Sequence, residues 1–236
     1  MRCGLYGKIP SKRDFINIAA SRHFLSFWEP WLANCLAESR AMLGEEVWRQ
    51  AFCEAPAWRF VLDARLYGGR VFGAFTPSID AIGRYFPLTL VAQEDAQALC
   101  AAPEADGCQI WFDAAEQLLL SVLDDDLARE QIDAGLGSLG AMNPGLQAVD
   151  NGPAAKSLQF ARLDDAEAAA QTLEQIFAAG RAQIGAASAV NYWWTLGHET
   201  YKPRALVYKS MPDSAHFAAM LGERFANPAQ ATPQSG

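Results

Sequence analysis

The chain has 236 residues, of which 51% are hydrophobic and 19% are charged, and its formal net charge is −8. This composition is typical of a globular protein that buries a core without help from a metal or a disulfide, and it excludes a disordered chain. The clearest basic cluster is Lys8, Lys12 and Arg13. We do not expect nucleic-acid binding, because that depends on many clustered cations that release counterions.

Cysteine usage and hydropathy narrow the class of protein further. The five cysteines are irregularly spaced and form no CxxC pair, which indicates free thiols in the core and neither a zinc site nor a disulfide framework. No apolar stretch reaches the roughly 20 residues of a membrane span, and charged residues interrupt the first segment, unlike a signal peptide. We therefore expect a soluble cytoplasmic protein with no membrane span, no metal and no cofactor.

The first 92 residues predict strands and two helices. Ser21 is a predicted N-cap, and apolar residues then recur at spacings of three and four. Pro30 lies inside this helix and is expected to kink it or to separate its first turn. The predicted elements are a strand at 2–9, helices at 21–44 and 45–54, and strands at 58–63, 70–75 and 86–92.

The second helix and the strands that follow it carry two further patterns. The second helix is expected to turn Val47, Trp48, Ala51 and Phe52 inward. The pair Gly68-Gly69 lies between two apolar runs, which favours an antiparallel hairpin.

The rest of the chain predicts helices, strands and one long loop. The segment 133–153 is rich in glycine and proline and is interpreted as a loop or linker. The other predicted elements are helices at 94–104, 113–127, 164–179 and 213–221, and strands at 157–163, 188–195 and 204–209. This order indicates a single layered α/β domain over residues 1–225 with a mixed sheet, followed by a disordered tail at 226–236.

Sequence motifs for common enzyme chemistries are incomplete. Gly7-Lys8 lacks the other residues of a phosphate-binding loop. The spacing of Gly135, Gly137 and Gly140 fits a dinucleotide fingerprint, but a polar helical segment precedes it where that fingerprint needs a strand, so a flexible connection is the better interpretation. His198-Glu199 has no second histidine at metalloprotease spacing.

Two segments, 4–15 and 77–88, thread charged residues through glycines, prolines and large apolar side chains. Asp80 and Arg84 are four residues apart and suit an ion pair if the segment is helical. Lys8 and Asp14 are candidates to fix the first loop. Three interpretations stay open for these charges: a structural network, a partner-binding surface and catalysis.

Two further features need partners in the fold. Arg59 lies between Trp58 and Phe60, so it must extend to solvent or find a carboxylate. Trp193 and Trp194 are adjacent on a predicted strand and must point to opposite faces, so at least one of them needs a cover.

Five blocks of the sequence occur in the order seen in the TagF (ImpM-type) proteins of bacterial type VI secretion, which the chain resembles. The blocks are 4–15, Trp28 and Trp31 with Ser39-Arg40, 55–60, 77–88 and 191–194. The resemblance is dense over residues 1–95 and thinner afterwards.

The resemblance implies a three-layer α/β/α sandwich around a mixed, largely antiparallel sheet, and a cytoplasmic accessory protein that is not an enzyme. It implies a post-translational negative regulator that binds the forkhead-associated scaffold protein of the system. We place the partner-binding surface where the two early segments meet, with Lys8, Asp14, Asp80, Arg84 and Arg59 as its candidate residues. The alternatives are a hydrolase of unknown substrate and a structural subunit of the secretion apparatus.

Overall fold

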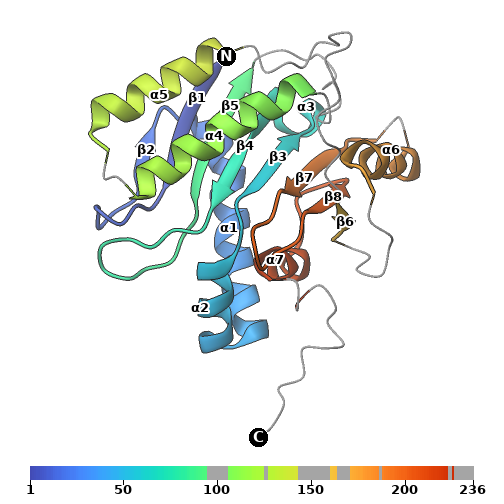
Figure 1. The fold of residues 1–236 in the computed structure, drawn as a ribbon, viewed down its shortest axis with the longest axis horizontal. Helices are drawn as coiled ribbons and strands as arrows, with labels where there is room; N and C mark the ends of the chain where they lie inside the picture. Colours follow the sequence, from blue (N-terminus) through green and yellow to red (C-terminus); the bar gives the residue numbers. More distant parts are fainter. Residues whose placement is uncertain are drawn as a thin grey trace, which may run out of the picture.

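Among the residues that the structure describes, one mixed sheet of eight strands forms the centre of the protein (Figure 1). The computed structural model describes residues 1–94, 106–124, 127–142, 160–163, 171–185, 188–222 and 225. The strands are β1 (Arg2–Gly7), β2 (Ile16–Ile18), β3 (Trp58–Leu62), β4 (Arg70–Thr76), β5 (Leu88–Glu94), β6 (Ala161–Arg162), β7 (Asn191–Thr195) and β8 (Arg204–Tyr208). Their order across the sheet is β2-β1-β5-β4-β3-β7-β8-β6, and every neighbouring pair is antiparallel except β6 with β8.

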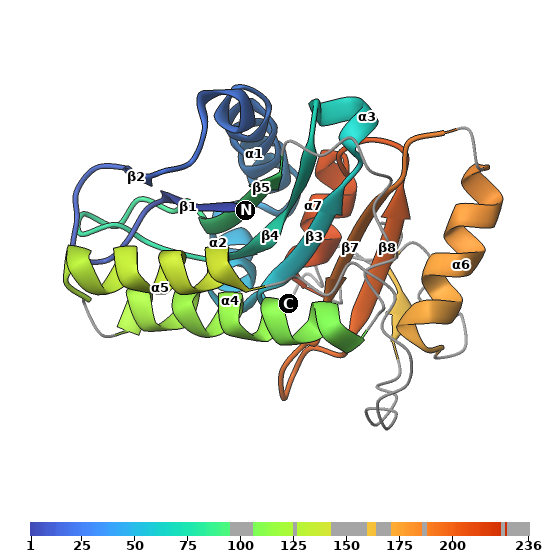
Figure 2. The ribbon, with the colours of Figure 1, turned by 90° about the horizontal axis from the view of Figure 1, so that it is seen from above.

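Helices cover both faces of this sheet. They are α1 (Arg22–Leu43), α2 (Glu45–Glu54), α3 (Ala64–Tyr67), α4 (Asp106–Asp124), α5 (Arg129–Ala141), α6 (Leu173–Ile184) and α7 (Ser214–Leu221). Figure 2 shows α4 and α5 side by side on one face, and α1 and α7 on the opposite face. The predicted three-layer α/β/α sandwich around a mixed, largely antiparallel sheet is confirmed.

Helix α1 begins where its cap residue predicts. The Ser21 side chain accepts a hydrogen bond from the Phe24 backbone N–H at 3.1 Å, which satisfies one of the free donors of the first turn. The helix runs as one element through Pro30, so the predicted separate first turn is wrong. Pro30 is exposed, and the backbone group that it leaves unpaired can be hydrated there.

The next elements follow the predicted order with two differences. Trp48, Ala51 and Phe52 of α2 are buried, but Val47 is exposed, because it lies outside the face formed by the other three. The strands β3 and β4 form the predicted antiparallel hairpin, and its connection contains the short helix α3, which ends at Gly68 with a left-handed φ of 69°.

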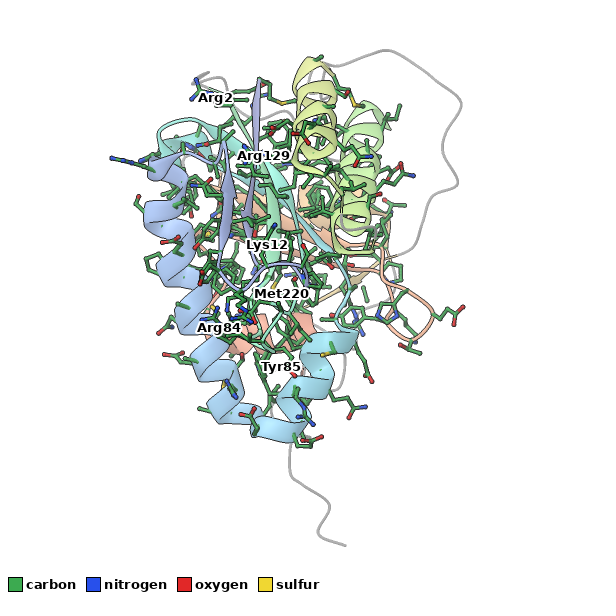
Figure 3. All side chains as sticks on the ribbon, turned by 90° about the vertical axis from the view of Figure 1, so that its left-hand side faces the viewer. Arg2, Lys12, Arg84, Tyr85, Arg129 and Met220 are labelled. Atoms are coloured by element: carbon green, nitrogen blue, oxygen red, sulfur yellow. The ribbon has the colours of Figure 1, made fainter. Side chains whose placement is uncertain are left out.

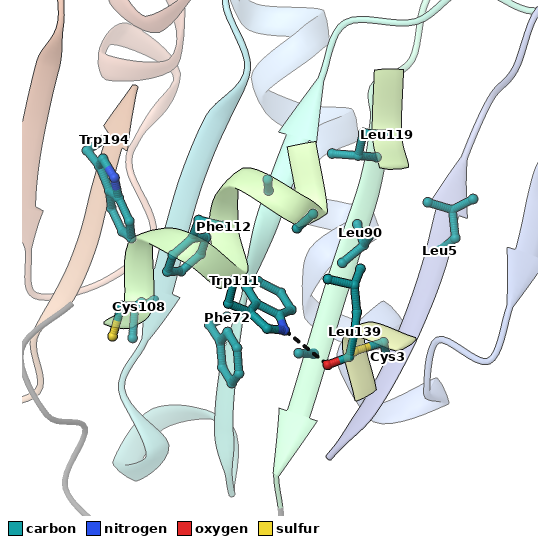
Figure 4. Packing of buried hydrophobic residues seen from close by; sticks show 14 of the residues in the cluster. Cys3, Leu5, Phe72, Leu90, Cys108, Trp111, Phe112, Leu119, Leu139 and Trp194 are labelled. Carbon is teal, nitrogen blue, oxygen red and sulfur yellow. Dashed lines mark hydrogen bonds between the residues drawn. The ribbon is translucent and has the colours of Figure 1, made fainter. Parts of the chain in front are cut away.

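Large aromatic side chains fill the core on both faces of the sheet. Trp193 and Trp194 are fully buried on opposite faces, as the strand alternation predicts. Trp194 packs edge-on against Phe112 of α4 with ring centroids 4.7 Å apart (Figure 4). In the same cluster, the Trp111 indole N–H donates to the Leu139 carbonyl at 3.3 Å and links α4 to α5.

The predicted loop at 133–153 is wrong over its first part, since residues 133–141 belong to helix α5. Ile132, Leu136 and Leu139 are buried against β1 and α4. Burial of this apolar face outweighs the low helix propensity of the glycines, so Gly135, Gly137 and Gly140 are helical and not a flexible connection.

The remaining predicted elements are found with shifted ends. Helix α4 begins seven residues before the predicted start at 113, and α6 begins nine residues after the predicted start at 164. Strands β7 and β8 and helix α7 lie where expected. The predicted helix at 95–104, the loop at 143–153, the strand residues 157–159, the helix residues 164–170 and the tail at 226–236 lie outside the described residues.

Two helical glycines give opposite expectations for replacement by alanine. A Cβ on Gly180 of α6 would lie 2.5 Å from Cβ of Val207 in β8, so Gly180→Ala should destabilise the fold by about 1–3 kcal/mol through overpacking. A Cβ on Gly137 of α5 would meet nothing within 4 Å, so Gly137→Ala should stabilise it by about 0.5–1 kcal/mol. Urea unfolding of both variants checks this pair, and equal effects would contradict the packing of α6 on β8.

Candidate functional site

The two charged segments meet at one end of the sheet. The loop of residues 8–15 follows β1, and the loop of residues 77–87 joins β4 to β5, so the antiparallel pairing of β1 with β5 brings both loops together. The Ser78 hydroxyl donates to the Lys8 carbonyl at 2.7 Å, and the Ala81 N–H donates to the Lys12 carbonyl at 3.0 Å. We call residues 8–15 and 77–87 the paired loops.

The Asp80 carboxylate is the centre of the paired loops. It accepts hydrogen bonds from the Lys8 ammonium at 2.8 Å, from Arg84 Nε at 2.7 Å, and from the backbone N–H groups of Ile82 and Arg84 at 3.1 and 2.8 Å. Asp80 and Lys8 are both buried. Asp80 and Arg84 pair as predicted, but they do so across a turn in which Gly83 has a φ of 84°, and not on a helix.

These contacts fix the protonation state of Asp80. Burial alone would raise the pKa of its carboxyl group, but the hydrogen bonds from Lys8, from Arg84 and from the Ile82 backbone outweigh burial and hold the pKa well below its usual range. Asp80 therefore stays ionised near neutral pH and is a weak proton acceptor there. Its role in this geometry is to hold the two loops together.

Two apolar side chains project from this network. The Phe15 ring stacks on Tyr6 at a centroid distance of 5.5 Å, lies edge-on to Phe86 at 4.8 Å, and has the Lys8 ammonium 5.1 Å from its centroid. Even so, Phe15 is 47% exposed, and Ile82 in the other loop is 56% exposed. The paired loops thus present apolar surface on a rigid support.

Charged side chains surround that apolar surface. Lys12, Arg13, Asp14 and Arg84 are exposed, so three cations lie around one carboxylate on a protein of net charge −8. Arg84 donates to the Arg13 carbonyl and lies 3.7 Å from the Asp14 carboxylate. In Figure 3, Lys12 lies between Arg84 and Arg129.

A groove extends this surface toward helix α5. It has a volume of about 520 Å³ and lies between the first loop, strand β2 and the start of α5. Its lining combines apolar side chains with Lys12 and Arg129, and Arg129 is paired with Asp133 at 2.9 Å. The paired loops and this groove together form what we call the loop-end surface.

The structure brings together four of the five predicted site residues, namely Lys8, Asp14, Asp80 and Arg84. Arg59 is not among them. It lies on β3 with its side chain 1% exposed beneath α4, where Glu116 and Asp113 bind it at 2.7 and 2.6 Å. It finds the carboxylates that its position requires, but it is not part of the loop-end surface.

Sequence reasoning missed the exposure of Phe15 and Ile82. Both lie in the segments that it singled out, but each has the same apolar character as buried residues of those segments, such as Ile9 and Phe86. Only the turn of the second loop, closed by the Gly83 N–H to the Asp80 carbonyl at 3.0 Å, directs Ile82 outward. The sequence signal alone could not separate these side chains from the core.

Among the described residues, no group of three or more His, Cys, Asp or Glu side chains could hold a metal ion. Cys3, Cys35 and Cys108 are buried thiols, and Cys53 is an exposed one. None of the helices in the described part of the chain combines the length and apolar character that a bilayer span needs.

The fold and the site define a class of protein. It is an α/β/α sandwich in which two loops, joined by hydrogen bonds and an ion pair, present an apolar surface surrounded by cations. The family model of the TagF N-terminal domain, type VI secretion system-associated, matches residues 4–139, which include both loops and most of α5. The chain belongs to the TagF family, and it is an accessory protein of type VI secretion.

A solved structure and the curated proteins give two further comparisons. The crystal structure of PA0076 from Pseudomonas aeruginosa PAO1 is similar, with a TM-score of 0.64, 25% sequence identity and 94% of each chain covered. Among curated proteins no match is found. The likeness to PA0076 extends beyond the residues that the family model matches, since it covers nearly the whole chain.

Proposed function

We propose that this chain restrains type VI secretion after translation by binding a cytoplasmic protein of the system, the forkhead-associated scaffold, through the loop-end surface. The observation that carries the proposal is the exposure of Phe15 and Ile82 on loops that a buried ion pair holds rigid. Exposed apolar anchors inside a charged rim are typical of protein-binding surfaces, because burial of the anchors supplies affinity and the rim sets orientation.

Rigidity supports the proposal as well. The Lys8–Asp80 pair and the hydrogen bonds between the loops fix both anchors before a partner arrives. A surface that is already ordered loses little conformational entropy on association, which favours tight binding.

We further propose that binding, and not catalysis, is the function of these charges. A general base needs a pKa near the working pH, whereas the hydrogen bonds of Asp80 hold its pKa far below that. Lys8 is paired with that carboxylate, so its ammonium is engaged and not available as a nucleophile. This arrangement favours a binding protein over the hydrolase alternative.

Ile82→Asp is the sharpest test of the loop-end surface. The change places a charge on the apolar anchor, and Ile82 is exposed, so the fold should be unaffected. We expect capture of the purified scaffold to weaken at least about tenfold, since a truncated anchor residue typically costs 2 kcal/mol or more. Binding is measured by calorimetry, with circular dichroism as the check on folding.

Ile110→Asp is the matched control. Ile110 is 64% exposed on α4, away from the paired loops, so this variant should bind the scaffold as the unchanged protein does. Equal loss of binding in both variants would indicate a general solubility effect. Normal binding by Ile82→Asp would place the partner elsewhere on the molecule.

Removal of the gene separates a repressor from a structural subunit. A repressor acts against assembly, so its loss should raise secretion of type VI effectors, and Ile82→Asp should reproduce that rise. Loss of secretion after deletion would favour a component of the apparatus instead.

A further inference from the structure

A second cavity lies at the opposite end of the sheet from the paired loops. It has a volume of about 610 Å³, within the range of small-molecule sites. The start of β1, the start of β4, the end of β5, helix α3 and the start of α1 meet around it, and Figure 2 looks down on this end of the sheet. Its polar lining includes Arg2, His23, Arg70 and Glu94.

Arg70 is buried, and among the described residues few of its five N–H donors have an acceptor. Its side chain is 10% exposed and forms an ion pair with Glu94 at 3.2 Å, and its buried Nε has no hydrogen-bond partner in the described part of the chain. Buried donors are normally satisfied, because an unpaired one keeps its full desolvation cost. A guanidinium with five donors and one weak pairing is suited to accept a further anion.

Arg59 shows how the same chain satisfies a buried arginine that has only a structural role. Its guanidinium donates to both oxygens of Glu116, to Asp113 and to Gln109, at distances of 2.6 to 2.9 Å. Among the described residues, Arg70 has only the Glu94 carboxylate as a charged partner. The difference between the two arginines indicates that the missing acceptors of Arg70 belong to a ligand.

The start of α1 adds positive potential to the same cavity. A helix N-terminus favours negative charge, and the first turn of this 22-residue helix contains no acidic residue that would supply it. The His23 Nε2 lies 2.7 Å from the Tyr67 carbonyl, so it is the donor of that bond and it fixes the ring at the cavity wall. The free N–H groups and the dipole of this helix N-terminus would stabilise a bound anion.

We propose that this cavity binds the phosphoryl group of a phosphorylated small molecule, held by Arg70, Arg2 and the start of α1. A phosphoryl group carries several acceptor oxygens and up to two negative charges, which matches a guanidinium fork, a second cation and a helix N-terminus better than one carboxylate does. The volume leaves room for the organic part of the ligand. This site is separate from the loop-end surface and does not depend on the function proposed for it.

The test is calorimetric titration of the full chain with inorganic phosphate and with adenosine 5′-monophosphate, using adenosine and acetate as comparators. Ionic strength is held constant, because salt screens exposed charges. We expect both phosphates to bind and to raise the Tm, by about 5 °C or more at a hundredfold excess over Kd. Adenosine and acetate should bind at least about tenfold more weakly, since neither offers the full set of acceptors.

Three substitutions locate the binding. Arg70→Met and Arg2→Met should each weaken phosphate binding about tenfold or more, since each removes a charge-assisted hydrogen bond. Arg49→Met, at an exposed arginine on α2, should leave it unchanged. If Arg70→Met does not fold, the phosphate affinity of Arg2→Met tests the proposal, because Arg2 is exposed and its loss should not affect folding. The proposal is overturned if neither phosphate binds, if acetate binds as well as phosphate, or if Arg2→Met binds as Arg49→Met does.

Discussion

Removing both carboxylates that hold Arg59 is expected to lower the free energy of unfolding by about 3–5 kcal/mol. The Arg59 side chain is 1% exposed between the sheet and α4, and in the variant Asp113→Ala/Glu116→Ala its hydrogen bond to Gln109 is the one left of those to these three side chains. A buried charge without counter-charges keeps its desolvation cost and loses the attraction that offset it. Thermal unfolding should show a fall in Tm of about 10 °C.

Replacing Arg59 itself should cost much less. Arg59→Met removes the buried charge and keeps most of the side-chain volume, while Glu116 and Asp113 are 19% and 57% exposed and can turn to water. We expect a loss under about 1.5 kcal/mol, because well-packed apolar replacements of buried ion pairs are often close to neutral. If Arg59→Met costs as much as the double variant, the pairing itself, and not the penalty of an unpaired charge, stabilises β3 against α4.

Asp80→Asn is expected to lower the Tm by roughly 5–10 °C at neutral pH, because it leaves the buried Lys8 ammonium without a counter-charge. The folded-state pKa of Asp80 lies below the value of about 3.9 of an unfolded aspartate, so its contribution to stability is fully present above about pH 4. That contribution is lost as the pH falls through the folded-state pKa. The difference in Tm between the two proteins should therefore be constant from pH 5 to 8 and shrink below pH 4.

Asp14→Asn is the control for this pH series. Asp14 is 96% exposed and lies 3.7 Å from Arg84, so its loss should change the Tm by no more than a degree or two. A pH-independent difference for Asp80→Asn would mean that the loops depend on the shape of this side chain and not on its charge. A large effect of Asp14→Asn would show that the exposed part of the network carries the stability.

The relation between the two proposed sites follows from the sheet. The loop-end surface and the phosphoryl cavity lie at opposite ends of the same three strands, β1, β4 and β5. The variants at Ile82 and Arg70 therefore test opposite ends of the sheet. Either proposal can be contradicted without affecting the other. If both succeed, the effect of phosphate on scaffold binding becomes a direct measurement of coupling between the two ends.

The sequence by itself determined the α/β class, the family and most of the helices and strands, because these depend on local patterns. The spacing of Phe24, Trp28 and Trp31 defined a helix with its cap at Ser21, and the pair Trp193-Trp194 required a cover for at least one of the two side chains. Such patterns repeat within one helix turn or one strand, so they can be interpreted without knowing the neighbours.

Only the tertiary structure decided which residues meet and which are left open. Lys8 and Asp80 are 72 residues apart in sequence and 2.8 Å apart in space, and no local spacing predicts that contact. The glycines of α5 are helical because their neighbours pack on β1 and α4, and Ile82 is exposed because a turn directs it outward. Burial and pairing across long sequence separations are properties of the packed sheet and its layers. In this protein they decide which residues belong to the core and which form the candidate site.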